Sequence, residues 1–203
     1  MAAVSTATRV TTVLRAAGLR ALSYKGPALA VQTAGVWSRR GSADADILIA
    51  QDDVPDAHKA LKGEGLYRRS GHSGPPGKFL KYRDSECAYL GLPCSVDLHW
   101  RLEDSPAYCR LPFAELWARR EEVTLVGHPI DTLGQIDALL VTAVHGSREH
   151  WWKWRWALDA NRQLEAVSLA QWHAAVERAR RAGAMRALAT ALAVATICGL
   201  TRS

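Results

Sequence analysis

Membrane-length apolar runs and paired cysteines are both missing from this sequence. No stretch approaches the ~20 uninterrupted apolar residues that a membrane-spanning helix needs. The first residues show no apolar run between a basic start and a small-residue cleavage site, so no secretory signal is expected. The four cysteines are scattered without a C-x-x-C pair, which predicts reduced thiols rather than a disulfide framework. These absences predict a cytoplasmic protein without membrane contact.

Internal repeats and low-complexity tracts are also absent from the sequence. Hydrophobic residues make up 48% and charged residues 23% of the 203 residues. These values are typical of a globular protein and exclude a disordered chain. The formal net charge at pH 7 is +6. A basic balance of this kind favours polyanionic partners, from nucleotides to RNA, over cationic ones.

The hydrophobic pattern changes near residue 131. Before that point, short helical and strand-like segments alternate, as they do in a mixed fold. After it the pattern is helical throughout, with capping-box patterns that begin at Thr132 and Ser168. We therefore predict an α/β core over residues 1–131 and a helical lobe over residues 132–203.

The expected elements follow from the spacing of apolar residues and from the positions of Gly and Pro. Strands are expected over residues 19–24, 43–50, 79–83 and 95–100, with a loop over 71–77 and a hairpin over 122–130. Helices are expected over residues 10–17, 27–33, 55–62, 112–119, 150–166 and 184–198, with two more that open at the capping boxes.

Two aspartates on one predicted strand are the first candidate for a site of chemistry. The segment 40–46 reads R-G-S-A-D-A-D. Because side chains two apart share a face of a strand, Asp44 and Asp46 point the same way. Two carboxylates so close repel each other unless a cation lies between them, and hard oxygen ligands suit Mg²⁺. Taken alone, the pattern also fits a strand with two solvated aspartates.

A second strand carries a third carboxylate. The segment 95–100 reads S-V-D-L-H-W, so its apolar residues share one face while Asp97 and His99 share the other. A polar face of this composition is compatible with a catalytic carboxylate. Taken alone, the segment is more typical of a half-exposed strand that has no catalytic role.

A glycine turn is the third candidate feature. Lys25, Gly26 and Pro27 follow a short apolar strand and precede a helix. Glycine permits close approach of the backbone, and the start of a helix presents N–H groups and a positive dipole end to a phosphate. Pro27 removes one of these N–H groups. A strand–Gly–helix turn is common, so it is unspecific when taken alone.

Together these motifs resemble the DNA-polymerase-β-like nucleotidyltransferase superfamily. The closer resemblance is to uncharacterised bacterial nucleotidyltransferases with the patterns K-G-x-A-L, R-x-S-x-D-x-D, V-D-L-H-W and H-x4-H-x-W. In this sequence the four patterns begin at Lys25, Arg40, Val96 and His145, and the resemblance extends from about residue 19 to residue 160. It implies an α+β fold, with a small mixed sheet flanked by helices and followed by a C-terminal helical lobe.

The resemblance also implies an activity. The enzyme would transfer the nucleoside monophosphate of an NTP such as ATP to an acceptor hydroxyl or phosphate, release pyrophosphate, and need Mg²⁺ or Mn²⁺. Asp44, Asp46 and Asp97 would be its catalytic and metal-binding residues. The candidates for nucleotide or acceptor contact are Lys25, Gly26, Arg40, Ser42, His99, His145, Arg148 and His150. The resemblance does not decide whether the acceptor is a tRNA, a peptide or a small molecule.

The segment 145–159 holds half of the eight tryptophans. If a helix covers 150–166, Trp152 and Trp156 share one face and are expected in the core. Trp151 and Trp154 then face other directions. With the basic side chains of this segment they would form a surface that stacks a base or lines an acceptor groove; these side chains are Arg148, Lys153 and Arg155.

Other functions compete with this interpretation. One is a toxin-like transferase that adds nucleotides to tRNA, and another is a catalytically inactive module that binds a nucleotide or a partner. A zinc site at His99, His145 and His150 is disfavoured, because the spacing of the last two does not place them on one helical face. A polycationic acceptor such as an aminoglycoside is also disfavoured, because its pocket needs abundant acid and this chain is basic.

Overall fold

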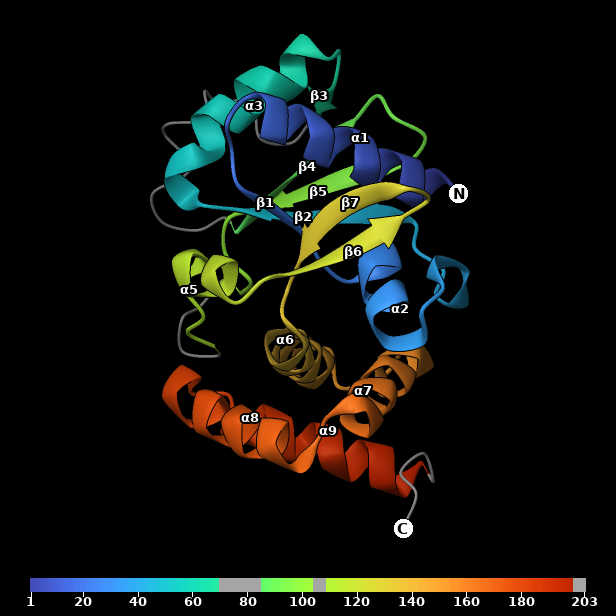
Figure 1. Cartoon of the computed structure of the whole chain (residues 1–203), viewed down its shortest axis with the longest axis vertical. Helices are drawn as coiled ribbons and strands as arrows, with labels where there is room; N and C mark the ends of the chain where they lie inside the picture. The colour runs from blue at the N-terminus through green and yellow to red at the C-terminus, as the bar shows by residue number, and fades with distance from the viewer. Residues whose placement is uncertain (70–84, 104–108, 199–203) are drawn as a thin grey trace. The chain divides into compact units, whose positions relative to one another are not determined.

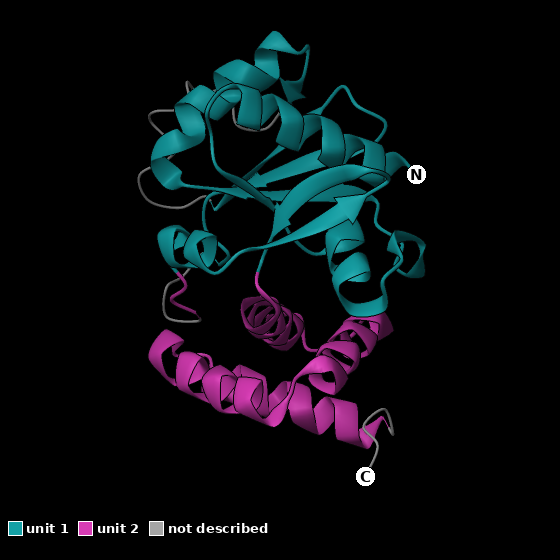
Figure 2. Cartoon of the chain, viewed as in Figure 1, with its two compact units in different colours: residues 1–104, 112–133 teal, residues 105–111, 134–203 magenta. Residues whose placement is uncertain are grey.

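The computed structural model describes residues 1–69, 85–103 and 109–198. The chain divides into two compact units, one formed by residues 1–104 and 112–133 and the other by residues 105–111 and 134–203 (Figure 2). The predicted loop over 71–77 and strand over 79–83 lie outside the described residues. The assignment of residues 1–131 to a catalytic core and of 132–203 to an accessory lobe stays a prediction.

The first unit is built on a mixed five-stranded sheet with the order β1-β2-β5-β4-β3 (Figure 1). Its strands are β1 (Ala21–Ser23), β2 (Asp44–Ile49), β3 (Tyr67–Arg68), β4 (Glu86–Leu90) and β5 (Ser95–His99). The central strands β2 and β5 are parallel, whereas the other neighbouring pairs are antiparallel. The sheet therefore places the two strands with the predicted carboxylates directly beside each other.

One face of this sheet is the main core of the first unit. Helices α1 (Ala2–Ala16) and α3 (Val54–Gly63) cover it, as Figure 1 shows. Alternate positions of the central strands point into this core, which holds Ile47, Ile49, Val96 and Leu98, each fully buried. Burial of such side chains contributes about 1.5–3 kcal/mol each, so the period-two pattern fixes which strand face remains for polar residues.

Helix α2 (Gly26–Ala34) and the hairpin of β6 (Glu121–Leu125) and β7 (His128–Thr132) complete the first unit together with α5 (Phe113–Ala118). A smaller cluster contains Leu125 and Ile130 of the hairpin, Val4 of α1 and Val31 of α2. The predicted strand-turn-helix at residues 19–33, the hairpin and the helix near 112–119 are confirmed. Pro27 lies in the first turn of α2, as the sequence indicated, and Gly35 ends the helix in the left-handed conformation.

The second unit consists of the helices α6 (Gln135–Arg148), α7 (Trp154–Ala166), α8 (Leu169–Ala182) and α9 (Met185–Ile197). Leucines and alanines of these helices form its core. The capping box at Ser168 is confirmed, because its side chain accepts from the backbone of Gln171 while the Gln171 side chain accepts from the backbone of Ser168. Within the described ranges no helix is long and apolar enough to cross a membrane.

Two expectations about local structure are wrong, and two short strands were missed. Thr132 does not open α6: it is the buried last residue of β7, and Gly134 caps the helix without a side-chain bond. The helix expected from residue 150 begins instead at Trp154, because His150 and Trp151 adopt positive φ angles that no α-helix accommodates. The short strands β3 and β4 were not predicted, since their half-exposed residues lack a clean alternation.

Candidate functional site

The three predicted aspartates lie on the polar face of the central strands. In the parallel pair of β2 and β5, Asp46 is directly opposite Asp97, and Asp44 is opposite Ser95. Because alternate residues of both strands are committed to the core, these carboxylates share the other face. All three are partly exposed. The register thus brings together the two motifs that the sequence separates by about fifty positions.

Asp97 shows how negative this face is. Burial raises the pKa of its carboxyl group to about 6, and the neighbouring carboxylates Asp46, Asp44 and Glu86 act in the same direction. His99 opposes the rise but does not cancel it. Four acidic groups therefore act on one small area, and a cation at this place would lower their mutual repulsion.

Asp46 is the carboxylate with the closest basic neighbours. Its Oδ1 lies 3.3 Å from Nζ of Lys25 and 3.3 Å from Nε2 of His99. Burial opposes ionisation of Asp46, but Lys25 and His99 outweigh it and hold the pKa of this carboxyl well below its usual range. The His99 contact is close in distance without the alignment of a hydrogen bond, so we regard it as an ionic contact.

His99 links Asp46 to a residue that the sequence analysis missed. Its Nδ1 lies 2.9 Å from Oε2 of Glu86, the first residue of β4, which is opposite His99 in the antiparallel register. Burial disfavours the charged imidazole, but contacts with Asp46 and Glu86 raise its pKa. The same contact lowers the pKa of Glu86. No motif singles out Glu86, and only recognition of β4 and its register could have found it.

The ring of Tyr24 packs against two members of this cluster. Its ring meets the imidazole of His99 edge to face, with centroids 5.3 Å apart, and Nζ of Lys25 lies 4.9 Å from the ring centroid. Burial, with Asp46 as the next cause, raises the pKa of the Tyr24 hydroxyl well above its usual value. The tyrosine therefore stays neutral and packs against the two basic side chains.

The turn between β1 and α2 positions Lys25 and leaves space for Ser42. Lys25 has φ 57° and ψ −156°, a region that residues other than glycine rarely occupy, at a cost of about 1–3 kcal/mol. Gly26 follows with φ 41°, and a Cβ on it would lie 3.1 Å from Oγ of Ser42. Ser42 in turn donates to Oδ1 of Asp44 over 3.0 Å. The glycine therefore leaves room for a hydroxyl that orients a candidate catalytic carboxylate.

The remaining candidates are arranged differently. Arg40 belongs to the first unit and lies half-buried just after the short 3-10 helix Trp37–Arg39. His145 and Arg148 lie on α6 of the second unit, and His150 follows that helix. Nη2 of Arg148 is 3.4 Å from Nδ1 of His145. The structure thus gathers Lys25, Gly26, Ser42, His99 and the three aspartates in one cluster, and places His145, Arg148 and His150 in the other unit.

Two tryptophan predictions are wrong. Trp152 was expected in the core, but it is 67% exposed. Trp151 was expected at the surface, but it is half-buried against alanines of the second unit. Both errors have one cause: residues 149–153 form a turn between two helices, so the helical spacing used for the prediction does not apply. Trp156 is buried and Trp154 is 57% exposed, as expected.

The donor set of the carboxylate face suits a divalent cation. As the side chains stand, no group of three or more His, Cys, Asp or Glu residues in the described segments is arranged to hold a metal ion. Asp46 contacts Lys25 and His99 instead. Carboxylate oxygens are the ligands that Mg²⁺ and Mn²⁺ prefer. Burial raises the pKa of Asp97 most, and the repulsion from neighbouring carboxylates, which a cation would reduce, adds to the rise. The residues present therefore fit such an ion.

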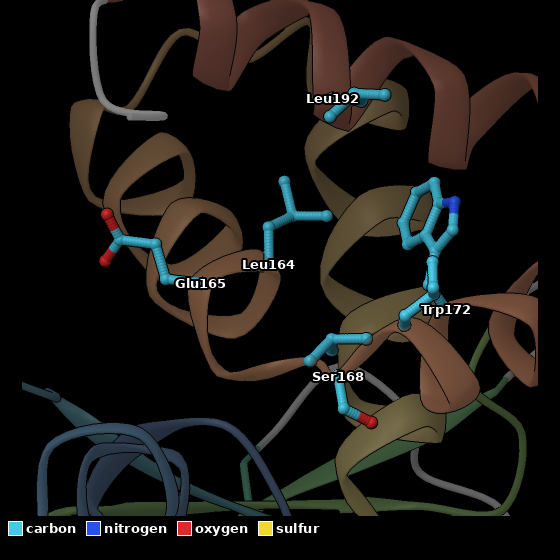
Figure 3. A pocket seen from close by; sticks show the side chains of 7 residues that line it. Leu164, Glu165, Ser168, Trp172 and Leu192 are labelled. Carbon is cyan, nitrogen blue, oxygen red and sulfur yellow. The ribbon is translucent and has the colours of Figure 1, made fainter. Parts of the chain in front are cut away.

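A large cavity lies elsewhere, in the second unit. It has a volume of about 890 Å³ and lies between the end of α7, the start of α8 and α9. Figure 3 shows Leu164, Trp172 and Leu192 around it, with Glu165 and Ser168 at its margin. One carboxylate and no cation occur among its lining residues. This lining does not suit a triphosphate, so the carboxylate face remains the candidate site.

A sequence model of the family described as uncharacterised nucleotidyltransferase matches residues 1–198. No curated protein matches the sequence. The crystal structure of ANT(2")-Ia in complex with adenylyl-2"-tobramycin is similar, with 10% identity, a TM-score of 0.61, and 88% of this chain and 97% of that chain covered. The solution structure of the antibiotic-resistance factor ANT(2'')-Ia has 13% identity and a TM-score of 0.56, and covers 93% and 95% of the two chains.

A further similar structure is the crystal structure of an antigenic nucleotidyltransferase-like protein from Paracoccidioides brasiliensis. It has 11% identity and a TM-score of 0.54, with 95% of this chain and 93% of that chain covered. At such identities the likeness concerns the fold alone. It confirms the predicted α+β class, with a small mixed sheet and a helical C-terminal part.

Proposed function

The chain belongs to the uncharacterised nucleotidyltransferase family, and we propose that it transfers the nucleoside monophosphate of an NTP, such as ATP, to an acceptor hydroxyl or phosphate in a Mg²⁺- or Mn²⁺-dependent reaction. One observation carries the proposal. Asp46 and Asp97 are opposite each other on parallel strands, and Asp44 shares their face. This alignment supports a common role for the three carboxylates in holding cations and substrate.

In the proposed reaction, an acceptor oxygen attacks the α-phosphorus and forms a new P–O bond. The bond from the α-phosphorus to the oxygen that bridges to the β-phosphate breaks, and pyrophosphate leaves with that electron pair. The acceptor proton passes to the carboxylate of Asp97 and then to solvent. The carboxylate of Asp97 shares the sheet face of Asp44 and Asp46, so it can accept this proton.

Asp44 and Asp46 would hold the divalent cations, and Asp97 would complete one of the two positions. Such cations supply neutralisation of the triphosphate charge and polarisation of the α-phosphate. Ser42 orients Asp44 through its hydroxyl. Glu86 and His99 fix the opposite side of Asp46, since the imidazole lies between the two carboxylates.

Lys25 and the start of α2 would bind the phosphates. The Lys25 ammonium is partly exposed and lies at the carboxylate face, where a triphosphate would bring its negative charge. The amino end of α2 offers backbone N–H groups and a positive dipole end to the same anion. We assign His145, Arg148 and His150 to nucleotide or acceptor contacts, and Arg40 to nucleotide contact.

The charge balance bears on the acceptor. One similar structure contains adenylyl-2"-tobramycin, but the net charge of +6 favours an acceptor that is not a polycation. A tRNA acceptor fits this balance, and a peptide or a small molecule remains an outcome of the test below. The four cysteines, all within the described segments, form no disulfide, which suits a reaction in the reducing cytoplasm.

Nucleotide binding tests the proposal first. Each of the four NTPs at millimolar concentration, with Mg²⁺ or Mn²⁺, is added to the metal-free protein and its Tm is measured. A ligand that binds only the folded state raises the Tm, so at least one NTP is expected to raise it only when metal is present. The absence of a shift with all four NTPs contradicts the proposal.

Transfer is then measured with NTPs labelled at the α-phosphate and a cell extract, which identifies the acceptor by its label. The proposed reaction requires label from the α-phosphate in the product and release of unlabelled pyrophosphate. The Asp46→Asn variant is the matched control. A catalytically inactive module would bind the NTP in the first experiment and label nothing in the second.

A further inference from the structure

The turn between α6 and α7 is strained. His150 has φ 52° and Trp151 has φ 54°, two consecutive left-handed residues without a glycine. This region is uncommon for any residue with a Cβ, and for a bulky aromatic residue it is a genuine outlier. A segment that keeps such a conformation must be held by its surroundings.

Trp151 supplies the hold. Its indole ring packs on α6 at Gly146, where a Cβ would lie 2.6 Å from the ring. The ring also packs against a cluster formed by Ala143, Ala160 and Ala191. The backbone N–H of Trp151 donates to the carbonyl of Gly146 over 2.8 Å. One tryptophan therefore fixes the turn. These residues on α6, α7 and α9, which its ring contacts, are all glycine or alanine.

The next two tryptophans point outward. Trp152 is 67% exposed and Trp154 is 57% exposed. Trp152 is also held in place: its ring meets Trp156 edge to face with centroids 6.0 Å apart. The ammonium of Lys153 lies 4.4 Å from the centroid of the Trp152 ring. These contacts order the ring and leave most of it open to solvent.

The segment that carries these rings is rich in basic residues. Residues 145–155 contain Arg148, Lys153 and Arg155 against a single carboxylate, Glu149, which lies 3.3 Å from Arg148. Arg155 follows Trp154 directly and is exposed. Open aromatic rings beside cations are the combination that binds unpaired bases, since the rings stack on the bases and the cations meet the backbone phosphates. A protein partner's apolar patch or a membrane would gain nothing from these cations without acidic groups of its own.

We propose that Trp152 and Trp154, with Lys153 and Arg155, form a binding surface for the unpaired bases of a single-stranded nucleic acid. We call these four residues the tryptophan surface. The surface would hold such a strand whether or not the carboxylate face transfers a nucleotide. Binding is therefore measured separately from activity, and its failure leaves the proposed reaction untouched.

The test measures binding of a fluorescently labelled 12-nucleotide RNA and its DNA equivalent to the full chain by anisotropy. A matched oligomer with abasic sugars keeps the phosphates and lacks the bases. Loss of a base–aromatic stack weakens binding about tenfold. We therefore expect Trp152→Ala and Trp154→Ala each to weaken binding of the base-containing strand about tenfold, and to leave binding of the abasic strand unchanged.

Tyr67→Ala is the matched control, because Tyr67 is an aromatic residue of similar exposure, 60%, on β3 of the first unit. It is expected to bind both strands as the wild type does. Trp154→Ala keeps the test valid if the Trp152 variant does not fold, since Trp154 is 57% exposed. The proposal is overturned if wild type and Trp154→Ala bind the base-containing strand equally. It is also overturned if the protein binds anionic vesicles but neither the RNA nor the DNA strand.

Discussion

Two turns of this molecule share an unusual backbone and differ in what holds it. Lys25–Gly26 in the first unit and His150–Trp151 in the second each have two consecutive positive φ angles. The first turn includes a glycine, and the Lys25 ammonium meets the carboxylate of Asp46. The second has no glycine and is held by the packing of an indole ring. We infer that the strained backbone of the first turn places the Lys25 ammonium beside Asp46. The strained backbone of the second turn presents the exposed tryptophans that follow it.

The largest effect on activity is expected from substitution of the carboxylates beside the first turn. Asp44→Asn, Asp46→Asn and Asp97→Asn keep the size of the side chain and remove its charge. Each is expected to lower kcat by about 10³-fold or more, because a ligand position for the cation is lost. The measurement is steady-state transfer of α-labelled NTP, with circular dichroism to confirm that the fold is kept.

Asp52→Asn is the control for these variants, since Asp52 is exposed and lies close in sequence outside the motif. It is expected to transfer at the wild-type rate. A carboxylate variant that keeps full kcat would show that this face is not the catalytic site.

The first turn itself is tested by Gly26→Ala. The new Cβ meets both the unfavourable φ of 41° and the Ser42 hydroxyl at 3.1 Å, so the link from Ser42 to Asp44 shifts. We expect kcat to fall about 10- to 100-fold, as small displacements of catalytic groups do. Gly35→Ala provides the match: its φ is 68° and nothing lies within 4 Å of its Cβ position. It should cost stability alone, so an equal loss of kcat in both variants would refute the role of Ser42.

The second turn is tested by Gly146→Ala. Its Cβ would lie 2.6 Å from the Trp151 ring, closer than atoms approach each other. The ring must move, and overpacking of this kind costs about 1–3 kcal/mol. We expect a lower free energy of unfolding, measured by urea denaturation, together with weaker binding of single-stranded RNA. Wild-type stability would mean that Trp151 does not anchor the turn.

The pH dependence of stability reports on the burial of Asp97 and on the repulsion from its neighbouring carboxylates. The pKa of Asp97 is raised to about 6 in the folded protein and is about 3.9 in an unfolded chain. The folded state therefore binds the proton more tightly, and this stabilisation is present below pH 4 and is lost as the pH rises through 6. Asp97→Asn should flatten this decline and stabilise the metal-free protein at pH 7 by about 1 kcal/mol, since solvent screens part of the shift.

The measurement compares urea unfolding of wild type and Asp97→Asn in chelator between pH 4 and 7. The difference between the two proteins isolates Asp97 from Asp46, whose lowered pKa acts in the opposite direction. Addition of Mg²⁺ should reverse the order, because the cation then stabilises the wild type. Parallel pH profiles in chelator would show that Asp97 is not crowded by its neighbours.

The fold was predictable where periodicity and glycine decide it. Leu98 lies on a strand in which apolar and polar residues alternate, so only one face of the strand can be buried. Gly183 ends a helix by its left-handed conformation. Periodicity failed where tertiary contacts decide. Thr132 has the sequence of a capping box, but its place in the β6–β7 ladder makes it the end of a strand. The turn at Trp151 depends on Gly146 and alanines of other helices, which no local pattern indicates.

The site was predictable in its acidic residues and not in their partners. The motifs indicated Asp44, Asp46 and Asp97, since each side chain alternates with core residues on its own strand. Glu86 was not found, because its link to His99 arises from the register of β4 with β5. The contact of Lys25 with Asp46 likewise depends on the ψ angle of Lys25, −156°, which the sequence does not predict.

A third turn has the same kind of strained backbone but lies outside both candidate sites. Val126 and Gly127 join β6 to β7 with φ angles of 50° and 82°. Two-residue hairpin loops of this kind favour Asn-Gly, whereas a β-branched residue at positive φ is strained. Val126 is 54% exposed, so little packing is lost in Val126→Asn. We expect stabilisation by about 1 kcal/mol, measured as a higher Tm, with kcat unchanged. Lys25→Gly relieves similar strain but removes the ammonium from Asp46, so its kcat should fall. If Val126→Asn lowered the Tm, positive φ would not be a cost in this protein, and the strain at the other two turns would indicate nothing about function.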